Sequence, residues 1–333
     1  MMNDEGAMKG GMARQSWRAA AAMLLALWAG AVTAQGWPDK PIRMVVGFPP
    51  GGAADILGRV ASQRLAESLG QQVVVDNRGG AGGLIATEIA ARAAPDGYTF
   101  LFTSIPHVIN PWLYRKVGYD AVRDFDPVIQ FVAVPLLLAS TNAFPAKSVK
   151  ELIAVARAKP GTINYASAGA GSSSHLAVEL FKQMAGVDLV HVPYKGTGPL
   201  ITDLIAGQVS VTIASIVPLL PQVKAGKLRG LAVTGRARSG ALPELPTIAE
   251  AGVPGYDVTN WFGVLAPART PKAIVTRVNA ELNRSLQTPE VKAALSAQGA
   301  DAAGGTPEAF AAMIRADLPK WEKVVKASGA RVD

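Results

Sequence analysis

The chain alternates short runs rich in β-branched and aromatic residues with segments of helical spacing along most of its length. The strand-like runs are Ile42–Val46, Val73–Asp76, Tyr98–Thr103, Leu136–Ser140, Asn164–Ser167, Leu189–Val192, Val209–Ala214 and Arg229–Thr234. Between the first two runs, Leu57, Leu65 and Leu69 recur at helical spacing. Strands that alternate with helices are typical of largely parallel sheets covered by helices on both faces. The pattern predicts an α/β fold.

The first 34 residues are typical of an export signal. Arg14 and Arg18 form a basic start, and residues 19–32 are apolar and uncharged. Fourteen apolar residues are too few to cross a bilayer, which takes about 20. No polar face recurs in this stretch, which argues against an amphipathic helix. We expect cleavage near Ala34, a mature chain that begins at Gln35, and a periplasmic location.

The composition excludes several classes of protein. The sequence has no cysteine, so an exported form would have neither disulfides nor thiolate chemistry. The formal net charge of +8 could suggest nucleic acid, but Lys and Arg are scattered and aromatic residues are not interleaved with them. We therefore expect no nucleic-acid partner. The positive charge instead favours small anions by raising their local concentration.

Two long extended segments divide the chain. They are Val128–Ser140 and Tyr256–Pro267, and both are longer than an average strand. Two such crossings in a chain of alternating strands and helices indicate two lobes joined by a double hinge. The predicted first lobe combines residues 35–135 and 258–333, and the second lobe covers residues 136–257.

Proline and hydroxyl residues mark several helix starts. The last 60 residues contain no strand-like run, and three helices are predicted there at Pro271–Gln287, Pro289–Gln298 and Pro307–Lys326. Thr270, Thr288 and Thr306 precede the three prolines as expected N-caps. Earlier in the chain, Ser148 and Glu151 match a capping box.

Four segments share one design, in which a strand ends in a turn of small residues and a helix begins. They are Gly51–Asp55, Arg78–Gly83, Ser104–Asn110 and Ser167–His175. A helix start offers up to four unpaired N–H groups and about half a positive charge, so it can bind an anion without a basic side chain. The alternative is that the glycines only make tight turns and that the serines and Asp55 only cap helices. Asp55 fits a first-turn or capping role better than that of a catalytic base.

The residues of these turns do not match the sequence motifs of known enzyme classes. Gly169 and Gly171 resemble part of a dinucleotide fingerprint, but its third glycine is missing. No glycine follows the serines as a hydrolase Gly-x-Ser-x-Gly motif requires. The histidines, His107, His175 and His191, do not pair at metal-ligand spacing. We expect no cofactor and no metal.

In these segments and their order, the chain resembles the Bug family, the TctC-like extracytoplasmic solute receptors of tripartite tricarboxylate transporters. The resemblance covers roughly residues 37 to 333. Its motifs occur in order as WPDKPIRMVVGFPPGGAADILGR (37–59), VVVDNRGGAGGLIA (73–86), DGYTFLFTS (96–104), DFDPVIQF (124–131), AKPGTINYASAGAGSSSHLAVELF (159–181), HVPYKGTGPLITDLIAGQV (191–209), GKLRGLAVTGRARSGALPELPTIAEAG (226–252) and WFGVLAPARTP (261–271).

The resemblance implies a two-lobed periplasmic binding protein of type II that closes like a flytrap, with a mostly parallel, helix-flanked sheet in each lobe and a double-strand hinge. It implies a non-enzymatic monomer that binds a small carboxylate, namely a di- or tricarboxylate, an acidic amino acid or an aromatic acid. The ligand residues it implies are Phe48, Gly51, Gly52, Asp55, Thr103 and Ser104 in the first lobe, Ser167, Gly169, Gly171, Ser172, Ser173, His175 and Tyr194 in the second, and Trp261 at the hinge.

The sequence departs from the family pattern at Ala54, Ser210 and Arg269, where the resemblance leads us to expect a hydroxyl residue, an Asp and a Gly. Two partners are compatible with such a receptor, a membrane permease or a membrane signalling protein. A secreted hydrolase that uses Ser172 or Ser173 is the alternative from a different class.

Overall fold

The computed structural model describes residues 36–331. The predicted signal peptide, with its cleavage site at Ala34, therefore lies outside the described residues. From Lys40 onward the chain forms one compact unit, and the architecture described below is that of this unit.

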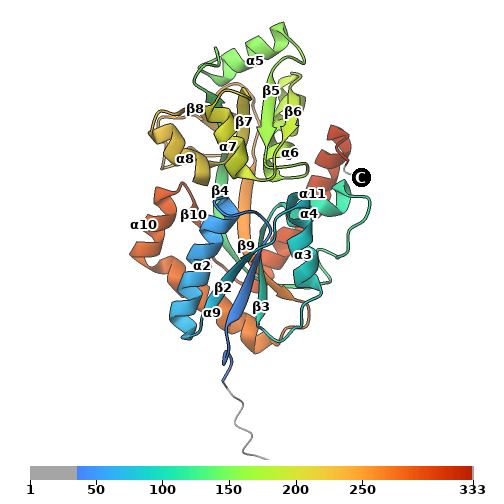
Figure 1. The fold of residues 1–333 in the computed structure, drawn as a ribbon, viewed down its shortest axis with the longest axis vertical. Coiled ribbons are helices and arrows are strands. Elements are labelled where there is room, and N and C mark those ends of the chain that lie inside the picture. Colours follow the sequence, from blue (N-terminus) through green and yellow to red (C-terminus); the bar gives the residue numbers. More distant parts are fainter. Residues whose placement is uncertain (1–35, 332–333) are drawn as a thin grey trace, which may run out of the picture. The chain divides into compact units, whose positions relative to one another are not determined.

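One group of strands is built from the first third of the chain. The strands β1 (Ile42–Val46), β2 (Val73–Asn77) and β3 (Thr99–Ser104) pair in parallel, with β1 in the middle. The helices between and after them are α2 (Ala53–Leu69), α3 (Leu84–Ala91) and α4 (Pro106–Leu113), and the 3₁₀ turn η1 (Ala81–Gly83) precedes α3. This group, with the C-terminal helices described below, is called the first lobe (Figure 1).

The second group of strands comes from the middle of the chain. The strands β5 (Asn164–Ser167), β6 (Val190–Pro193) and β7 (Val211–Ser215) pair in parallel, and β8 (Leu228–Val233) pairs with β4. Its helices are α5 (Val149–Ala158), α6 (Ser173–Ala185), α7 (Thr197–Ile205) and α8 (Ile216–Lys224). This group is called the second lobe.

Two long strands connect the groups (Figure 1). The strand β4 (Phe125–Thr141) pairs antiparallel with β9 (Thr259–Pro267) as far as Pro135, and from Leu136 onward it pairs with β7 and β8. The predicted α/β fold with two lobes and a double-strand hinge is confirmed. The sheet is parallel within the βα units and antiparallel at the two crossing strands.

The C-terminal segment folds back on the first lobe. It forms α9 (Lys272–Gln287), α10 (Pro289–Ala297) and α11 (Pro307–Ser328). The side chains of Thr288 and Thr306 cap α10 and α11 as predicted. The prediction for Thr270 is wrong, because Pro271 occupies the cap position of α9 and the Thr270 hydroxyl donates to the carbonyl of Pro267 instead.

Two further details differ from the sequence analysis. A two-residue strand, β10 (Asp301–Ala302), pairs with β4 in a region where we expected only helices. Ser148 caps α5 by accepting from the Glu151 N–H, but the Glu151 carboxylate accepts from the N–H of Lys147 and so does not close the expected box.

The helix α11 packs against elements of both lobes. It contacts α4 and β4, and it also contacts α6 of the second lobe. The indole N–H of Trp261 on β9 donates to the Asp317 carboxylate of α11 over 2.9 Å, and the ring of Phe310 packs edge-on against the same indole. The hinge strand β9 is thus fastened to a helix that reaches the second lobe.

Arg269 holds a left-handed backbone, with φ of 71°. This conformation favours glycine, the residue that the family resemblance led us to expect there. Among the helices of residues 36–331, none combines the length and apolar character needed to cross a membrane.

Candidate functional site

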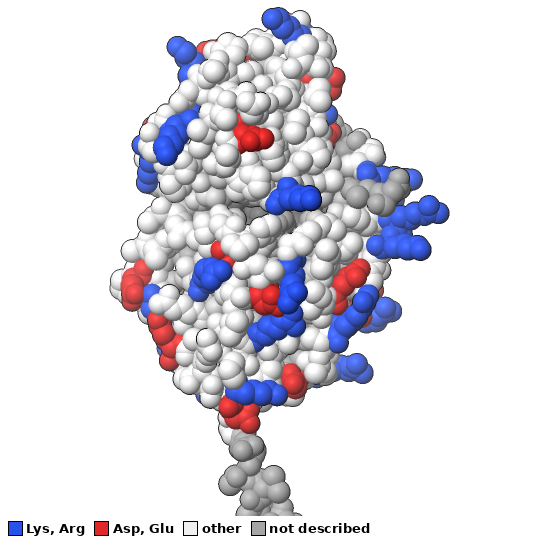
Figure 2. All heavy atoms as spheres, in the orientation of Figure 1, with Lys and Arg blue, Asp and Glu red and all other residues white. Residues whose placement is uncertain are grey.

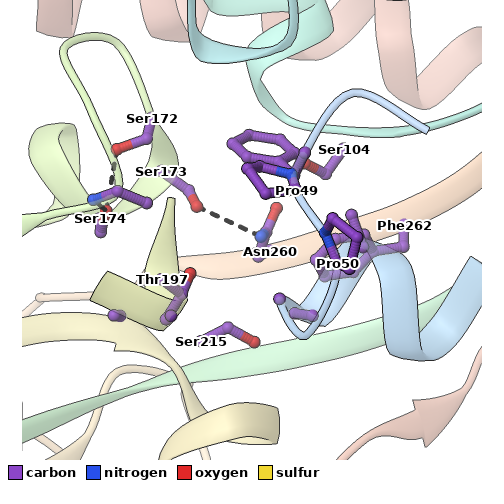
Figure 3. Close-up of a pocket in the computed structure, with 17 residues that line it drawn as sticks. Pro49, Pro50, Ser104, Ser172, Ser173, Ser174, Thr197, Ser215, Asn260 and Phe262 are labelled. Carbon is purple, nitrogen blue, oxygen red and sulfur yellow. Dashed lines mark hydrogen bonds between the residues drawn. The ribbon is translucent and has the colours of Figure 1, made fainter. Parts of the chain in front are cut away.

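A small cavity of about 40 Å³ lies where the two lobes meet at the crossing strands. Loops of the first lobe form one wall and helix starts of the second lobe form the other (Figure 3). The first lobe contributes Phe48, Pro49, Pro50, Gly52, Ala53, Ala54 and Ser104; the second contributes Ala168, Ser172, Ser173, Ser174, Thr197, Gly198, Ala214 and Ser215; and β9 contributes Asn260 and Phe262.

The first-lobe wall follows directly from the turn between β1 and α2. Phe48, Pro49 and Pro50 present apolar side chains, and α2 begins at Ala53 without a side-chain cap. Gly51 has φ of 82°, which lets the chain bend sharply before the helix. The wall therefore offers an apolar surface beside an uncapped helix start.

Asp55 is held behind this wall by the protein itself. Its carboxylate accepts from the Gly51 N–H over 3.0 Å and from the Asn77 amide over 3.1 Å, and it pairs with the Arg59 guanidinium over 2.9 Å. Burial raises the pKa of Asp55, but these hydrogen bonds and the Arg59 charge outweigh burial and hold the pKa below its usual range. The charged carboxylate thus fixes the turn, and the Gly51 N–H is already used.

The second-lobe wall is made of hydroxyl groups that bind their own turn. Ser172 caps α6 by accepting from the His175 N–H, and its hydroxyl also donates to the Gly169 carbonyl over 2.6 Å. The hydroxyls of Ser172 and Ser174 lie 2.8 Å apart, and Ser174 accepts from the Ala168 N–H. The turn is therefore fixed by hydroxyl contacts and carries no net charge.

Two stacked histidines lie behind this turn. The rings of His175 and His191 are nearly parallel with centroids 4.1 Å apart, and His191 also stacks on Tyr165. The Gly171 N–H donates to Nδ1 of His175, and Nε2 of His191 lies 2.6 Å from the Ser167 hydroxyl. Burial lowers the pKa of His175, and burial followed by the His175 charge lowers the pKa of His191 to about 4. Both rings are uncharged near neutral pH.

Two more helix starts of the second lobe reach the cavity. The helix α7 begins after Gly196 and α8 begins after Ser215, and neither has a side-chain cap. Thr197 and Ser215 line the cavity at these starts. Together with α2, three uncapped helix starts face a space whose lining contains no Lys or Arg. Such a set of N–H groups and helix dipoles favours an anion.

Asn260 on β9 lies in the middle of the cavity (Figure 3). Its amide nitrogen donates to the Ser173 hydroxyl over 3.3 Å, which joins the crossing strand to the second lobe. Its amide oxygen is buried without a hydrogen-bond partner, and the same is true of the Ser215 hydroxyl. These two atoms are unsatisfied polar groups at the cavity.

The residues named in the sequence analysis lie in three places. Phe48, Gly52, Ser104, Ser172 and Ser173 line the cavity. Gly169 and Tyr194 line a neighbouring groove of about 600 Å³, which shares Phe48, Pro49, Pro50 and Ala168 with the cavity and also contains Gly79–Gly83 and Lys195. The others, Gly51, Asp55, Thr103, Ser167, Gly171, His175 and Trp261, are absent from the lining of either space.

Sequence reasoning missed Thr197, Ser215 and Asn260, whereas Ser174 lies within the predicted turn Ser167–His175. Ser215 follows a predicted strand and precedes a helix, so the same rule that selected the four turns could have found it. Asn260 is a polar residue in an otherwise apolar strand, which was its only signal in the sequence.

Glycines let the lobes approach each other closely beside the cavity. A Cβ at Gly171 would lie 2.0 Å from the side chain of Leu113 in the first lobe, and one at Gly82 would lie 3.1 Å from the carbonyl of Ala170 in the second. A Cβ at Gly196 would meet Pro49 at 3.2 Å. The present approach of the lobes therefore depends on residues without side chains.

The geometry does not favour hydrolysis at the serines. The Ser172 hydroxyl bonds to the Gly169 carbonyl and to Ser174, and the Nδ1 of His175 accepts from a backbone N–H. The pair that does form, between Ser167 and His191, involves a serine with 0% exposure, which a substrate cannot reach. Within residues 36–331 there is no cluster of three metal-ligating side chains.

Charged side chains are dispersed on the surface shown in Figure 2. Lys and Arg appear there mostly as separate groups, and the surface around the hollow between the lobes is mostly uncharged apart from a basic side chain beside it.

Comparison with known proteins identifies relatives of the same architecture. Residues 57–330 match the model of the tripartite tricarboxylate transporter family receptor. The solved structure "R. palustris Rpa4515 with adipate" is 42% identical, with a TM-score of 0.87 over 89% of this chain and 100% of that one. The periplasmic binding protein BugD is 35% identical, with a TM-score of 0.84 over 89% and 99%. MatC from Rhodopseudomonas palustris with bound malate is 33% identical, with a TM-score of 0.82 over 87% and 100%.

The matches extend over nearly all of the described residues and include both lobes and the crossing strands. The fold and the family are those of non-enzymatic solute-binding receptors of the periplasm. The chain belongs to the TctC family of tripartite tricarboxylate transporter receptors, which includes the Bug proteins.

Proposed function

We propose that the protein captures one small carboxylate in the cavity between its lobes and presents it to a membrane permease of the tripartite tricarboxylate type. The observation that carries this proposal is the set of three uncapped helix starts, those of α2, α7 and α8, around a cavity lined without Lys or Arg. Neutral donors and helix dipoles suit an anion whose charge is delocalised over two oxygens.

Two relatives support the choice of a carboxylate. Their structures contain adipate and malate, at 42% and 33% identity to this chain. Both compounds are dicarboxylates, and they differ in length and in one hydroxyl group. Adipate and malate are therefore the first ligands to test.

The cavity volume supports a closing motion. About 40 Å³ holds one or a few water molecules, whereas a cavity of about 150 Å³ accommodates benzene. A dicarboxylate that fills this cavity therefore requires the lobes to separate, and it then stabilises whichever closed state it contacts from both sides. The glycines at the lobe contact, Gly82, Gly171 and Gly196, permit this approach.

The site residues form part of the proposal. Those named from the sequence act either at the ligand or as supports of the turns that face it, and Ser174, Thr197, Ser215 and Asn260 join them. We propose that the first lobe covers residues 35–135 and 258–333 and that the second lobe covers residues 136–257. The strand β4 changes its partner strands between Pro135 and Leu136, which supports the boundary at residues 135 and 136. We further propose export with cleavage near Ala34 and action as a monomer.

A titration of the purified mature protein tests the function. Adipate, malate, an acidic amino acid, an aromatic acid and an amine of similar size should be compared by calorimetry and by thermal shift. A carboxylate present at 100 times its dissociation constant should raise the stability by about 2.7 kcal/mol. Small-angle scattering should show a smaller radius of gyration with that ligand. Failure of every carboxylate to bind would contradict the proposal.

A further inference from the structure

Two polar atoms at the cavity have no hydrogen-bond partner. They are the hydroxyl oxygen of Ser215, a residue with 8% exposure, and the amide oxygen of Asn260, a residue with 2% exposure. Leaving such a group buried and unpaired costs about 1–3 kcal/mol. In Figure 3 Asn260 lies between Ser173 and Pro49, and Ser215 lies on the side of Thr197.

The two residues are placed by rigid elements. Ser215 ends the buried strand β7 and stands at the uncapped start of α8, so its hydroxyl lies beside the free N–H groups of that helix. Asn260 lies on β9, one of the two strands that connect the lobes. A ligand group that reaches both residues therefore contacts the second lobe and the hinge together.

The chemistry of both groups suits a carboxylate. The Ser215 hydroxyl can donate a hydrogen bond to a carboxylate. The side-chain amide of Asn260 can be rotated by a half-turn, so that its nitrogen faces the cavity and can donate as well. The Ser173 hydroxyl would then donate to the amide oxygen. The lining also contains apolar side chains, among them Pro49, Ala53 and Phe262. A ligand with two polar ends and an apolar middle matches a lining of this mixed composition.

We propose that Ser215 and Asn260, with the start of α8, form a subsite for the second carboxylate of a dicarboxylate ligand. The first carboxylate lies at the start of α2, one of the three helix starts on which the proposed function depends, and the inference rests on that function. The subsite selects dicarboxylates over monocarboxylates of the same length, because a methyl group would leave both polar atoms unpaired.

The test compares adipate with hexanoate, in which a methyl group replaces one carboxylate. Ser215→Ala should weaken adipate binding about tenfold, the value of one hydrogen bond to a charged group, and should leave hexanoate binding unchanged. Asn260→Leu, of similar size, should weaken adipate binding by at least the same factor and strengthen hexanoate binding. Calorimetry measures both affinities in each variant.

Ser140→Ala is the matched control. The Ser140 hydroxyl is also buried without a partner, but it lies on β4 and does not line the cavity. This variant should bind both acids as the wild type does. Thermal unfolding should show that Ser215→Ala is as stable as Ser140→Ala, because neither change removes a hydrogen bond.

The outcomes separate the two proposals. If the wild type binds neither adipate, malate nor any other carboxylate, the proposed function fails. If the wild type binds adipate but Ser215→Ala and Asn260→Leu keep its preference for adipate over hexanoate, the subsite is overturned and the function stands. A wild type that binds hexanoate as tightly as adipate also overturns the subsite.

Discussion

The turns of the two lobes face each other across the cavity, yet they are stabilised in different ways. In the first lobe, the charged carboxylate of Asp55 holds the turn through Gly51, Asn77 and Arg59. In the second lobe, neutral hydroxyls and two uncharged histidine rings hold the turn. One turn depends on an ion pair and the other on hydrogen bonds between neutral groups.

The side chains that the two lobes present to the cavity also differ in polarity. The first lobe presents mainly proline and alanine side chains beside a helix start, whereas the second lobe presents Ser172, Ser173, Ser174, Thr197 and Ser215. An anion such as Asp55 would repel a carboxylate bound in the cavity. The negative charge of Asp55 instead lies behind the wall, where Arg59 compensates it. The difference indicates that the first lobe contributes apolar side chains and the backbone N–H groups of α2, whereas the second lobe contributes most of the side-chain hydroxyls.

The largest expected effect concerns the contact between the lobes. In Gly171→Ala the new Cβ would lie 2.0 Å from the end of the Leu113 side chain, so the buried Leu113 must shift before the lobes can close as observed. Overpacking of about 1–3 kcal/mol predicts a loss of ligand affinity of about five- to hundredfold, measured by calorimetry with the tightest carboxylate.

Gly186→Ala provides the control for backbone strain. Gly186 also has a positive φ, of 62°, but no atom lies within 4 Å of its hypothetical Cβ. This variant should lose about 1 kcal/mol of stability and keep its affinity. Equal affinity of Gly171→Ala and wild type would show that closure does not need the contact.

The next effect tests the ion pair of the first lobe. Asp55→Ala leaves the Gly51 N–H and the Asn77 amide without their acceptor, so the free energy of unfolding should fall by about 2 kcal/mol, measured in urea. The order of preference among carboxylates should remain, because Asp55 lies behind the wall. A changed order would mean that the first lobe contributes to selectivity.

The third prediction uses pH to distinguish the stability contributions of the two turns. His191 has a pKa of about 4 in the folded protein against about 6.5 when unfolded. Folding favours the neutral form of His191. The contribution of His191 to the free energy of unfolding is therefore fully present above pH 6.5 and is lost as the pH falls toward 4. The maximum slope is about 1.4 kcal/mol per pH unit. Asp55, with its lowered pKa, loses its contribution only at still lower pH.

Urea unfolding of wild type and His191→Gln between pH 7 and 4.5 measures this effect. The variant should have a smaller slope, and the remaining slope comes in part from His107, whose pKa burial also lowers to about 4. Ligand affinity of the wild type should fall over the same range as the second turn loosens. An identical slope in wild type and variant would show that the stacked pair does not titrate in this window.

The smallest effect concerns the cap of α6. Ser172→Ala removes a side chain that caps the helix and binds the Gly169 carbonyl, and it should cost about 1 kcal/mol of stability together with some ligand affinity. Ser148→Ala removes the equivalent cap of α5, far from the cavity. Its cost in stability should be similar and its affinity unchanged, as thermal unfolding and calorimetry would show.

Local sequence patterns predicted most of the elements. The bounds of β1 and β5 agree with the sequence analysis, because each is a short run between clear turn signals. The strand β10 was missed because two exposed residues carry no periodicity, and their pairing depends on β4 from a distant part of the chain.

The site was predictable only where a turn carries its own signal. The serine turn and the α2 start have small residues at a strand end, and both line the cavity. The contacts of Asp55 with Asn77 and of Asn260 with Ser173 depend on how distant parts of the chain lie in space. Such long-range contacts leave no periodic pattern in the sequence.

The attachment of Trp261 to α11 has a practical consequence. The indole is bonded to the half-buried Asp317, whose pKa burial raises, and the same helix packs on α6 of the opposite lobe. We expect a rotation about β4 and β9 to change the polarity around this ring. Intrinsic fluorescence should therefore follow opening and closing of the unlabelled protein, on the millisecond scale of a stopped-flow mixer.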